Sequence, residues 1–385
     1  MSEWENVNLG SLLSFGNGKS RPLDSGNIPV YGGNGIMSYV SQSNYDQETI
    51  IIGRVGAYCG ATYYENKPIW ISDNALSAKA IGKNNTKYLY YLLKNLDLNQ
   101  FAEGSSHPLL TQKLLKSVGT KAALNPNEQK SIASVLSCLD DKIDLLHLQN
   151  KTLESMAEAL FRQWFIEEAQ EDWEITTLEC HITIAKGLSY KGAGLTTSDN
   201  GIPLFNLNSV LEGGGYKSTG IKYYNGDFKE RHIIKSGDII VANTEQGHEY
   251  RLIGYPAIIP TTKSELSIYT HHLFKININD DSYLTNAFMY YLLCSKDMHE
   301  QVVAATNGST VNQLSADGLQ RPEFKLPPEY KVKDFTTQIA SFWKKISINN
   351  SQIKNIESLR DTLLPKLMSS EVRVQYAEEA IASVA

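Results

Sequence analysis

The sequence predicts an α+β protein in which two globular segments alternate with two long helices. Two stretches repeat apolar residues every seven positions, and short motifs of the first globular segment recur in the second. A chain of 385 residues is also long enough for at least two domains, at roughly 100–200 residues per domain. We therefore divide the chain into residues 1–126, 127–168, 169–328, 329–369 and a tail, 370–385.

The first globular segment, residues 1–126, mixes short β-type runs with one short helical pattern. Residues 49–52 (Thr-Ile-Ile-Ile) are flanked by polar turn residues and predict a strand, and residues 88–96 predict a helix. Loops rich in Gly, Asn and Ser separate these runs. We expect an α+β domain with an irregular, mostly antiparallel β core.

Residues 127–168 contain neither Gly nor Pro, and their apolar residues follow a heptad repeat. One row consists of Ile132, Leu139, Leu146, Leu153 and Leu160. A second row lies four residues further on, at Leu136, Ile143, Asn150, Ala157 and Trp164. This spacing predicts a long helix with a coiled-coil seam, extending roughly 60 Å at 1.5 Å per residue. Asn125 and Pro126 supply the expected start signals.

The second globular segment, residues 169–328, repeats motifs of the first. The pairs are Trp4-Glu5 with Trp173-Glu174, Ile28-Pro29-Val30-Tyr31 with Ile202-Pro203-Leu204-Phe205, Ile50-Ile51-Ile52-Gly53 with Ile239-Ile240-Val241-Ala242, and Gly104-Ser105-Ser106 with Gly308-Ser309-Thr310. The distance between copies grows from 169 to 204 residues along the chain. Loop insertions in the second copy would produce this drift, so we predict a duplication.

Residues 329–369 form the second heptad segment, preceded by Pro327 and Pro328. Its two rows are Val332, Ile339, Ile346 and Ile353, and Phe335, Phe342, Asn349, Ile356 and Leu363. Shifting the first helix by 200 positions superposes the rows and places Asn150 on Asn350. A polar residue in each seam would act as a register device in either parallel or antiparallel helices; alternatively, one or both Asn face water. The residues assigned to the helix seam are Ile132, Leu139, Leu146, Asn150, Leu153, Leu160, Val332, Ile339, Ile346, Asn350 and Ile353.

Composition argues against a secreted, membrane-spanning or disulfide-stabilised protein. No apolar run approaches the ~18–20 residues of a membrane span, and residues 1–10 lack a signal-peptide pattern, so we expect a cytoplasmic location. The four cysteines form no CxxC pair, which argues against a zinc site and favours free thiols. The net charge of −6 is concentrated in residues 127–172, with four basic and ten acidic side chains, which leaves a basic face elsewhere possible.

The sequence offers no catalytic constellation and no metal site. Residues 18–20 (Gly-Lys-Ser) end like a phosphate-binding loop, but Leu13 stands where its first Gly is required. Asp140, Asp141 and Asp144 are more typical of a solvated helix face than of a magnesium site. No methyltransferase Asn-Pro-Pro-Tyr tetrapeptide or serine-hydrolase motif is present.

Polar and aromatic loops in both globular segments suggest DNA contacts instead. Arg, Asn, Gln, Ser and Thr read base edges and Lys contacts phosphates, although a solvated loop would look similar. The candidate DNA-binding residues are Lys19, Arg21, Tyr31, Asn34, Arg54, Tyr58, Ser105, Ser106, His107, Lys186, Lys191, Asn206, Asn208, Asn243, Gln246, His248, Arg251, Asn307, Ser309 and Thr310.

The heptad segments also carry a family resemblance. Residues 127–132 (Asn-Glu-Gln-Lys-Ser-Ile), 139–144 (Leu-Asp-Asp-Lys-Ile-Asp) and 160–165 (Leu-Phe-Arg-Gln-Trp-Phe) resemble the central conserved region of specificity subunits of type I restriction–modification systems. Residues 359–369 (Leu-Arg-Asp-Thr-Leu-Leu-Pro-Lys-Leu-Met-Ser) resemble the closing motif of that family. Ser370 departs from the pattern, because the family usually has Gly before Glu371.

The resemblance implies two target recognition domains, each reading one half of a bipartite double-stranded DNA site. It also implies that the two helices are spacers packed as an antiparallel coiled coil, giving a pseudo-twofold duplication. Two methyltransferase subunits would modify adenine with S-adenosylmethionine, and two motor-nuclease subunits would use ATP and Mg²⁺. This chain itself would then need no cofactor.

Three other functional interpretations remain open. The chain could be a helical assembly scaffold, or a degenerate specificity subunit without DNA recognition. A hydrolase with an unrecognised site would show activity as an isolated chain. Salt-dependent, sequence-selective DNA binding separates the leading hypothesis from these alternatives.

Overall fold

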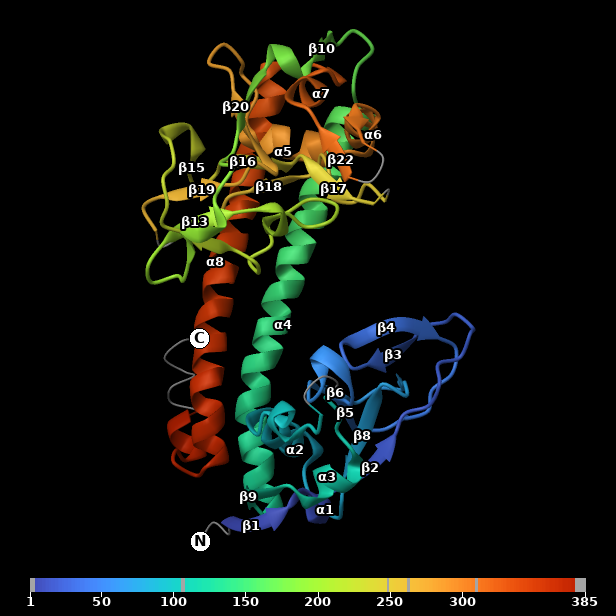
Figure 1. Ribbon diagram of the computed structural model, residues 1–385. Coiled ribbons are helices and arrows are strands. Elements are labelled where there is room, and N and C mark those ends of the chain that lie inside the picture. The colour runs from blue at the N-terminus through green and yellow to red at the C-terminus, as the bar shows by residue number, and fades with distance from the viewer. Residues whose placement is uncertain (1–3, 105–107, 248, 262–263, 309–310, 378–385) are drawn as a thin grey trace. The chain divides into compact units, whose positions relative to one another are not determined.

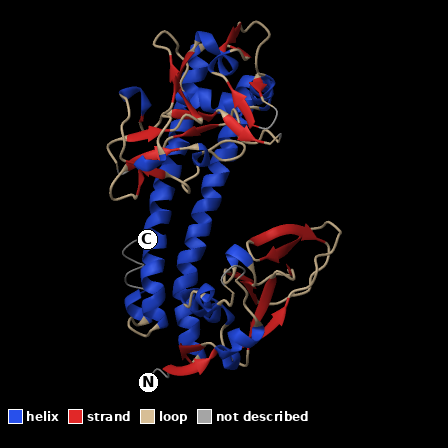
Figure 2. Cartoon of the chain, in the orientation of Figure 1, coloured by secondary structure: helices blue, strands red, loops and turns tan. Residues whose placement is uncertain are grey.

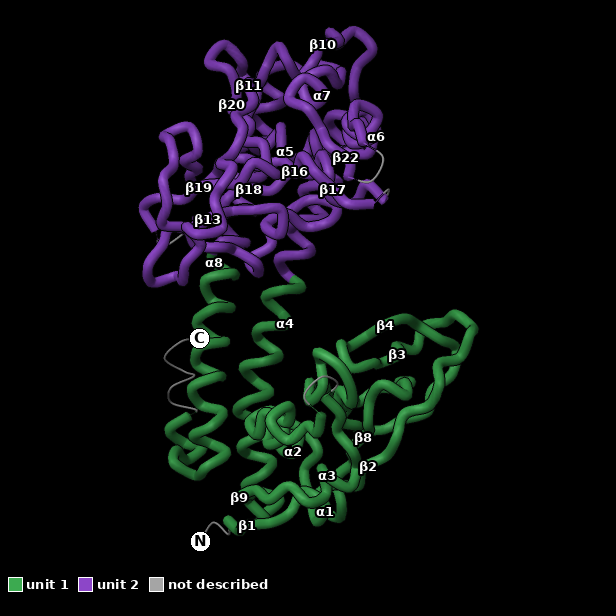
Figure 3. Tube along the Cα trace, in the orientation of Figure 1, with its two compact units in different colours: residues 1–148, 348–385 green, residues 149–347 purple. Residues whose placement is uncertain are grey.

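The computed structural model describes residues 4–104, 108–247, 249–261, 264–308 and 311–377 (Figure 1). The chain forms two compact units, shown in Figure 3: unit 1 is residues 1–148 with 348–385, and unit 2 is residues 149–347. We call residues 1–126 domain 1 and residues 169–328 domain 2. Each unit therefore combines one domain with half of each long helix. Within the described residues, no helix is long and apolar enough to cross a membrane.

The two long helices predicted from the heptads are confirmed. The first, α4, is Pro126–Arg162 and continues into a π-helical turn, Gln163–Glu167. The second, α8, is Glu329–Met368. Asn125 begins α4 as predicted, because its side-chain oxygen accepts a hydrogen bond from the Asn127 N–H at 2.9 Å.

The two helices are antiparallel. In unit 1, Leu139 and Leu146 of the first half of α4 share a core with Ile353 and Leu363 of the last half of α8. In unit 2 the last half of α4 shares a core with the first half of α8, where the Phe161 and Phe335 rings are 5.6 Å apart. Early residues of one helix thus meet late residues of the other, which confirms the direction that the family resemblance implied.

The structure corrects one residue of the predicted seam. Asn150 is buried, but Asn350 is exposed, and Asn349 is the fully buried residue. Asn349 continues the row of Phe335 and Ile356, whereas Asn350 points about 100° further around the helix. Among the other predicted seam residues, Leu153, Leu160 and Ile346 are half-buried.

The described part of domain 1 forms three small sheets, whose strands are drawn as red arrows in Figure 2. Their strands, in order of pairing, are β1 (Trp4–Asn8) and β9 (Gly119–Ala123); β2 (Leu13–Asn17), β8 (Ala75–Ala80), β5 (Thr49–Gly53) and β6 (Thr62–Glu65); β4 (Gly35–Val40), β3 (Ile28–Gly32) and β7 (Trp70–Ile71). Among the described residues of this domain, β3 and β7 alone pair in parallel. The helices are α1 (Leu9–Leu12), α2 (Thr86–Asn95) and α3 (Gln112–Ser117).

Domain 2 repeats this plan with additions. Its paired strands are β10 (Ile175–Thr177) and β23 (Glu323–Lys325); β11 (Ile182–Lys186), β20 (Leu273–Ile278), β16 (Ile239–Ala242) and β18 (Pro256–Ile258); β12 (Leu195–Thr196), β14 (Lys222–Tyr224), β13 (Ile202–Phe205), β19 (Ser267–Tyr269) and β15 (Ile233–Ile234); β17 (Thr244–Gln246), β22 (Val311–Leu314) and β21 (Thr306–Asn307). Its helices are α5 (Asn286–Cys294), α6 (Lys296–Ala304) and α7 (Ala316–Gln320).

The duplication extends to individual hydrogen bonds. In domain 1 the Lys19 N–H donates to the Ile71 carbonyl at 2.9 Å, and in domain 2 the Leu188 N–H donates to the Tyr269 carbonyl at 2.8 Å. The parallel pair β3–β7 likewise corresponds to β13–β19. The two domains are therefore copies of one fold, as the repeated motifs predicted.

A glycine precedes each of these matched amides, and close packing explains it. A Cβ at Gly18 would lie 1.8 Å from the Ser72 carbonyl oxygen, and one at Gly187 would lie 2.2 Å from the Thr270 oxygen. The Gly18-Lys19-Ser20 sequence therefore serves close backbone packing at the end of β7.

Candidate nucleic-acid interface

Four segments of domain 1 meet at the end of β5. The Arg54 N–H donates to the Asn74 carbonyl at 3.0 Å, and the Arg54 carbonyl accepts from the Leu110 N–H at 2.9 Å. An ideal Cβ at Gly33 would lie 3.7 Å from the carbonyl oxygens of both Asn74 and Val55. Backbone hydrogen bonds and close approach thus bring the β3–β4 turn and three loops together.

This meeting point holds three of the predicted DNA-binding residues. Asn34 lies on the β3–β4 turn and is exposed, as is Tyr58, at 52%, on the loop after β5. Arg54 is half-buried, and within the described structure its Nε has no hydrogen-bond partner. Arginine, amide and aromatic side chains gathered at one point are of the types that contact base edges and sugar–phosphate groups.

Lys19 and Arg21 lie on the exposed segment after β2. Backbone bonds fix Lys19, whose carbonyl accepts from the Trp70 indole at 3.2 Å, and its side chain remains exposed. Arg21 contacts the Ser38 hydroxyl on β4 at 3.3 Å. The neighbouring Met37 and Tyr39 are 52% and 53% exposed, and no sequence motif marks them as contacts. Exposed apolar groups can contact thymine methyls.

The prediction that Tyr31 contacts DNA is wrong, because its side chain is buried. Its ring is 6% exposed, and its hydroxyl donates to Glu65 Oε1 at 2.5 Å. Burial and this carboxylate raise the pKa of the Tyr31 hydroxyl well above its ordinary value. The repeat contained the signal, because the matching residue in the second copy is Phe205, which has no polar group and is fully buried.

Domain 2 brings the corresponding segments together. The Asn243 N–H donates to the His272 carbonyl at 3.1 Å, and the Asn243 carbonyl accepts from the Leu314 N–H at 2.8 Å. These two bonds match those of Arg54. The Asn243 side chain, however, is buried and donates to the His271 carbonyl at 2.9 Å, so its prediction as a DNA contact is corrected.

Asn206 is also structural. It is buried, its Nδ2 donates to the Gly220 carbonyl at 2.8 Å, and its Oδ1 accepts from the Asn208 N–H at 3.0 Å. Its side chain therefore caps a short turn and is not available to read bases. Asn208 remains exposed on that turn.

The other predicted residues of domain 2 fall into two groups. Those whose side chains are exposed are Lys186, Lys191, Asn208, Gln246, Arg251 and Asn307. Three lie outside the described residues: His248, Ser309 and Thr310. The predicted residues Ser105, Ser106 and His107 of domain 1 also lie outside them.

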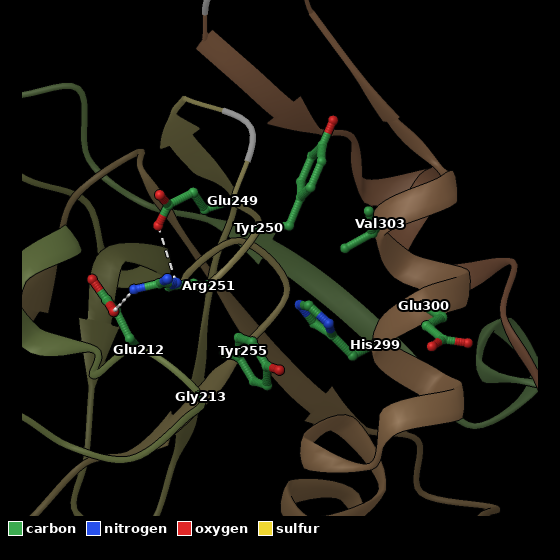
Figure 4. Close-up of a pocket in the computed structure, with 9 residues that line it drawn as sticks. All are labelled: Glu212, Gly213, Glu249, Tyr250, Arg251, Tyr255, His299, Glu300 and Val303. Atoms are coloured by element: carbon green, nitrogen blue, oxygen red, sulfur yellow. Dashed lines mark ion pairs between the residues drawn. The ribbon is translucent and has the colours of Figure 1, made fainter. Parts of the chain in front are cut away.

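Arg251 borders a cavity of about 610 Å³, shown in Figure 4. Its Nε lies 3.0 Å from Glu249 and its Nη1 lies 3.7 Å from Glu212. Tyr255 and His299 stack on the same wall with ring centroids 3.9 Å apart, and burial lowers the pKa of the His299 imidazole. Carboxylates around the guanidinium repel phosphates but leave Arg251 able to approach a neutral base edge.

Comparisons with known proteins agree with this architecture. Residues 1–155 match the family described as "Type I restriction modification DNA specificity domain". The specificity subunits of the type I restriction enzymes MjaIX and MjaVIII from Methanocaldococcus jannaschii are 26% and 23% identical to this chain. The alignments cover 75% and 97% of this chain and 70% and 94% of those proteins. The crystal structure of a type I restriction–modification S subunit from M. genitalium has the same fold, with a TM-score of 0.59 at 17% identity over 95% of this chain and 96% of that one.

Proposed function

Because the chain belongs to the family of type I restriction–modification specificity subunits, we propose that it reads a bipartite DNA target, one half with each domain. The observation that carries this proposal is the duplication. Both domains gather corresponding loops at the end of the corresponding strand, β5 in domain 1 and β16 in domain 2. Two copies of one loop cluster suit two half-sites of one target.

In this proposal the chain directs catalysis by other subunits and performs none itself. Two methyltransferase subunits bind S-adenosylmethionine and methylate adenine, and two motor-nuclease subunits use ATP and Mg²⁺ for restriction. The helices α4 and α8 space the two domains and hold these partners. DNA binding should weaken as salt concentration rises, since phosphate contacts contribute to affinity.

Methylation mapping of host DNA with and without this gene tests the proposal, because it reports the target directly. Replacing residues 1–126 by the corresponding domain of a relative should change one half-site and leave the other unchanged. A change in both half-sites would contradict the assignment of one half-site to each domain. Purified chain that binds DNA without sequence preference would instead favour an assembly scaffold or a degenerate subunit.

Methyl transfer by the isolated chain would contradict the non-catalytic role. The assay combines purified chain, S-adenosylmethionine and DNA carrying the mapped target, with the assembled methyltransferase as the positive control. We expect transfer only in the control.

A further inference from the structure

A buried carboxylate fixes a surface turn of domain 2. Glu245 lies on β17, is only 9% exposed, and faces residues 249–254, which we call the Arg251 turn. Its Oε1 accepts from the Arg251 N–H at 3.0 Å. Its Oε2 accepts from the N–H groups of Leu252 and Ile253, each at 2.9 Å.

These three bonds explain why an acid occupies this buried position. A buried carboxylate is costly unless it is hydrogen-bonded, and three consecutive amides provide the partners. In turn, the amides of a tight turn have no strand to pair with and would otherwise need water. The carboxylate and the turn therefore stabilise one another.

Backbone and imidazole hydrogen bonds also hold two carbonyls of the turn. The Gly213 N–H donates to the Arg251 carbonyl at 2.9 Å, and His299 Nε2 donates to the Ile253 carbonyl at 3.1 Å. Tyr250 has a φ of 50°, a backbone conformation that is uncommon for a non-glycine residue. A turn held in this conformation depends on the groups around it.

Domain 1 has a shorter segment at this place. The Gly254 N–H donates to the Ala242 carbonyl twelve residues earlier, and the matching bond joins Gly60 to the Gly53 carbonyl seven residues earlier, each at 2.8 Å. The Arg251 turn thus belongs to an insertion that domain 2 carries within the loop cluster. An element present in one copy can give that copy its own specificity.

We infer that Glu245 is a positioning residue for DNA recognition: it fixes the Arg251 turn so that the Arg251 guanidinium reads a base edge in the half-site of domain 2. This inference rests on the proposed function. Arg251 reaches solvent, with a side chain 61% exposed, and its guanidinium forms ion pairs with Glu212 and Glu249. Glu245 acts through the turn and makes no DNA contact itself.

The test uses the full chain assembled with its methyltransferase subunits and three duplexes: the mapped target and two versions with one half-site scrambled. The ratio of affinities between intact and scrambled duplexes measures how well each half-site is read. For Glu245→Gln, we expect the ratio for the half-site of domain 2 to fall by about tenfold, the size of one good base contact. The ratio for the half-site of domain 1 should stay unchanged.

Two further variants separate positioning from general stability. The double variant Glu245→Gln/Arg251→Ala should have the same affinity ratio for the half-site of domain 2 as Arg251→Ala alone, because the turn then has no arginine to position. Glu230→Gln, which changes an exposed glutamate of domain 2, should leave both ratios unchanged. Hydrogen exchange of the free protein should be faster at Arg251, Leu252 and Ile253 in Glu245→Gln than in wild type, and unchanged in Glu230→Gln.

The outcomes are distinguishable. Faster exchange with unchanged half-site ratios would overturn the inference while leaving the proposed function intact, as would an equal fall of both ratios. Unchanged exchange would show that Glu245 does not hold the turn. A wild-type complex that does not discriminate either half-site would overturn the proposed function, and with it the inference.

Discussion

Asp140 and Arg360, which lie far apart in the sequence, form an ion pair in unit 1 with Oδ1 and Nη1 2.9 Å apart. The other Asp140 oxygen accepts a hydrogen bond from the Tyr91 hydroxyl at 2.6 Å. Both charged side chains are largely buried, at 19% and 17% exposure. The contact joins α2, α4 and α8, whereas the sequence had suggested a solvated helix face at Asp140.

Asp140→Asn should therefore lower the stability of unit 1. The substitution leaves Arg360 without the charge of Asp140, and we expect a loss of about 2 kcal/mol, less than for a fully buried pair. Denaturant unfolding measures the change in the free energy of unfolding, and hydrogen exchange of the α2 amides shows that the loss lies in unit 1. Asp141→Asn, at the exposed neighbouring position, should change stability by less than about 0.5 kcal/mol. Equal losses in the two variants would show that the pair contributes nothing.

Gly187→Ala should destabilise domain 2. The new Cβ would lie 2.2 Å from the Thr270 carbonyl oxygen, so the segment after β11 would have to move, at a cost of about 1–3 kcal/mol. Faster hydrogen exchange in the β11–β20 ladder reports the effect. Gly192→Ala is the matched control, since nothing lies within 4 Å of its Cβ position. The close-packing explanation fails if both variants exchange alike.

Acid should destabilise unit 2. Burial lowers the pKa of His181, His232, His272 and His299, all in this unit, below the ordinary value of 6.5. As pH falls below about 6.5, the unfolded state binds protons that the folded state does not, so stability decreases towards the folded-state pKa values. Unfolding of unit 2 at pH 7.5 and 5.5 measures the loss. His181→Gln keeps a polar group beside Ser282 and should reduce the pH dependence; an unchanged dependence would contradict this role.

Lengthening both helices should change the spacing between half-sites. Four extra residues after Asn150 in α4 and after Asn349 in α8 add about 6 Å to each helix. If the helices are the spacer, methylation mapping should find a target gap about one or two base pairs longer, at 3.4 Å per base pair. The same insertion after Ser198, in an exposed loop of domain 2, should leave the gap unchanged. An unchanged gap in an assembled helix variant would show that the partner subunits set the spacing.

Local pattern determined the architecture of this protein. A heptad row buries one face of a helix wherever the helix lies, so α4 and α8 could be located from Ile132 and Val332 onward. The repeated motifs predicted a second copy of domain 1, because similar short sequences in the same order form the same strands and turns. The residues alone did not decide whether the two helices run parallel or antiparallel, because an Asn in each seam is compatible with both directions.

Only the tertiary structure decided which polar side chains are available to DNA. Asn243 and Asn208 look alike in sequence, but Asn243 is buried against the His271 carbonyl whereas Asn208 faces solvent. Glu245 gave no signal, because the amides that it accepts from become neighbours only when the insertion folds back. The physical reason is general: periodicity fixes which face of an element is apolar, whereas the partner of a polar group is fixed by long-range packing.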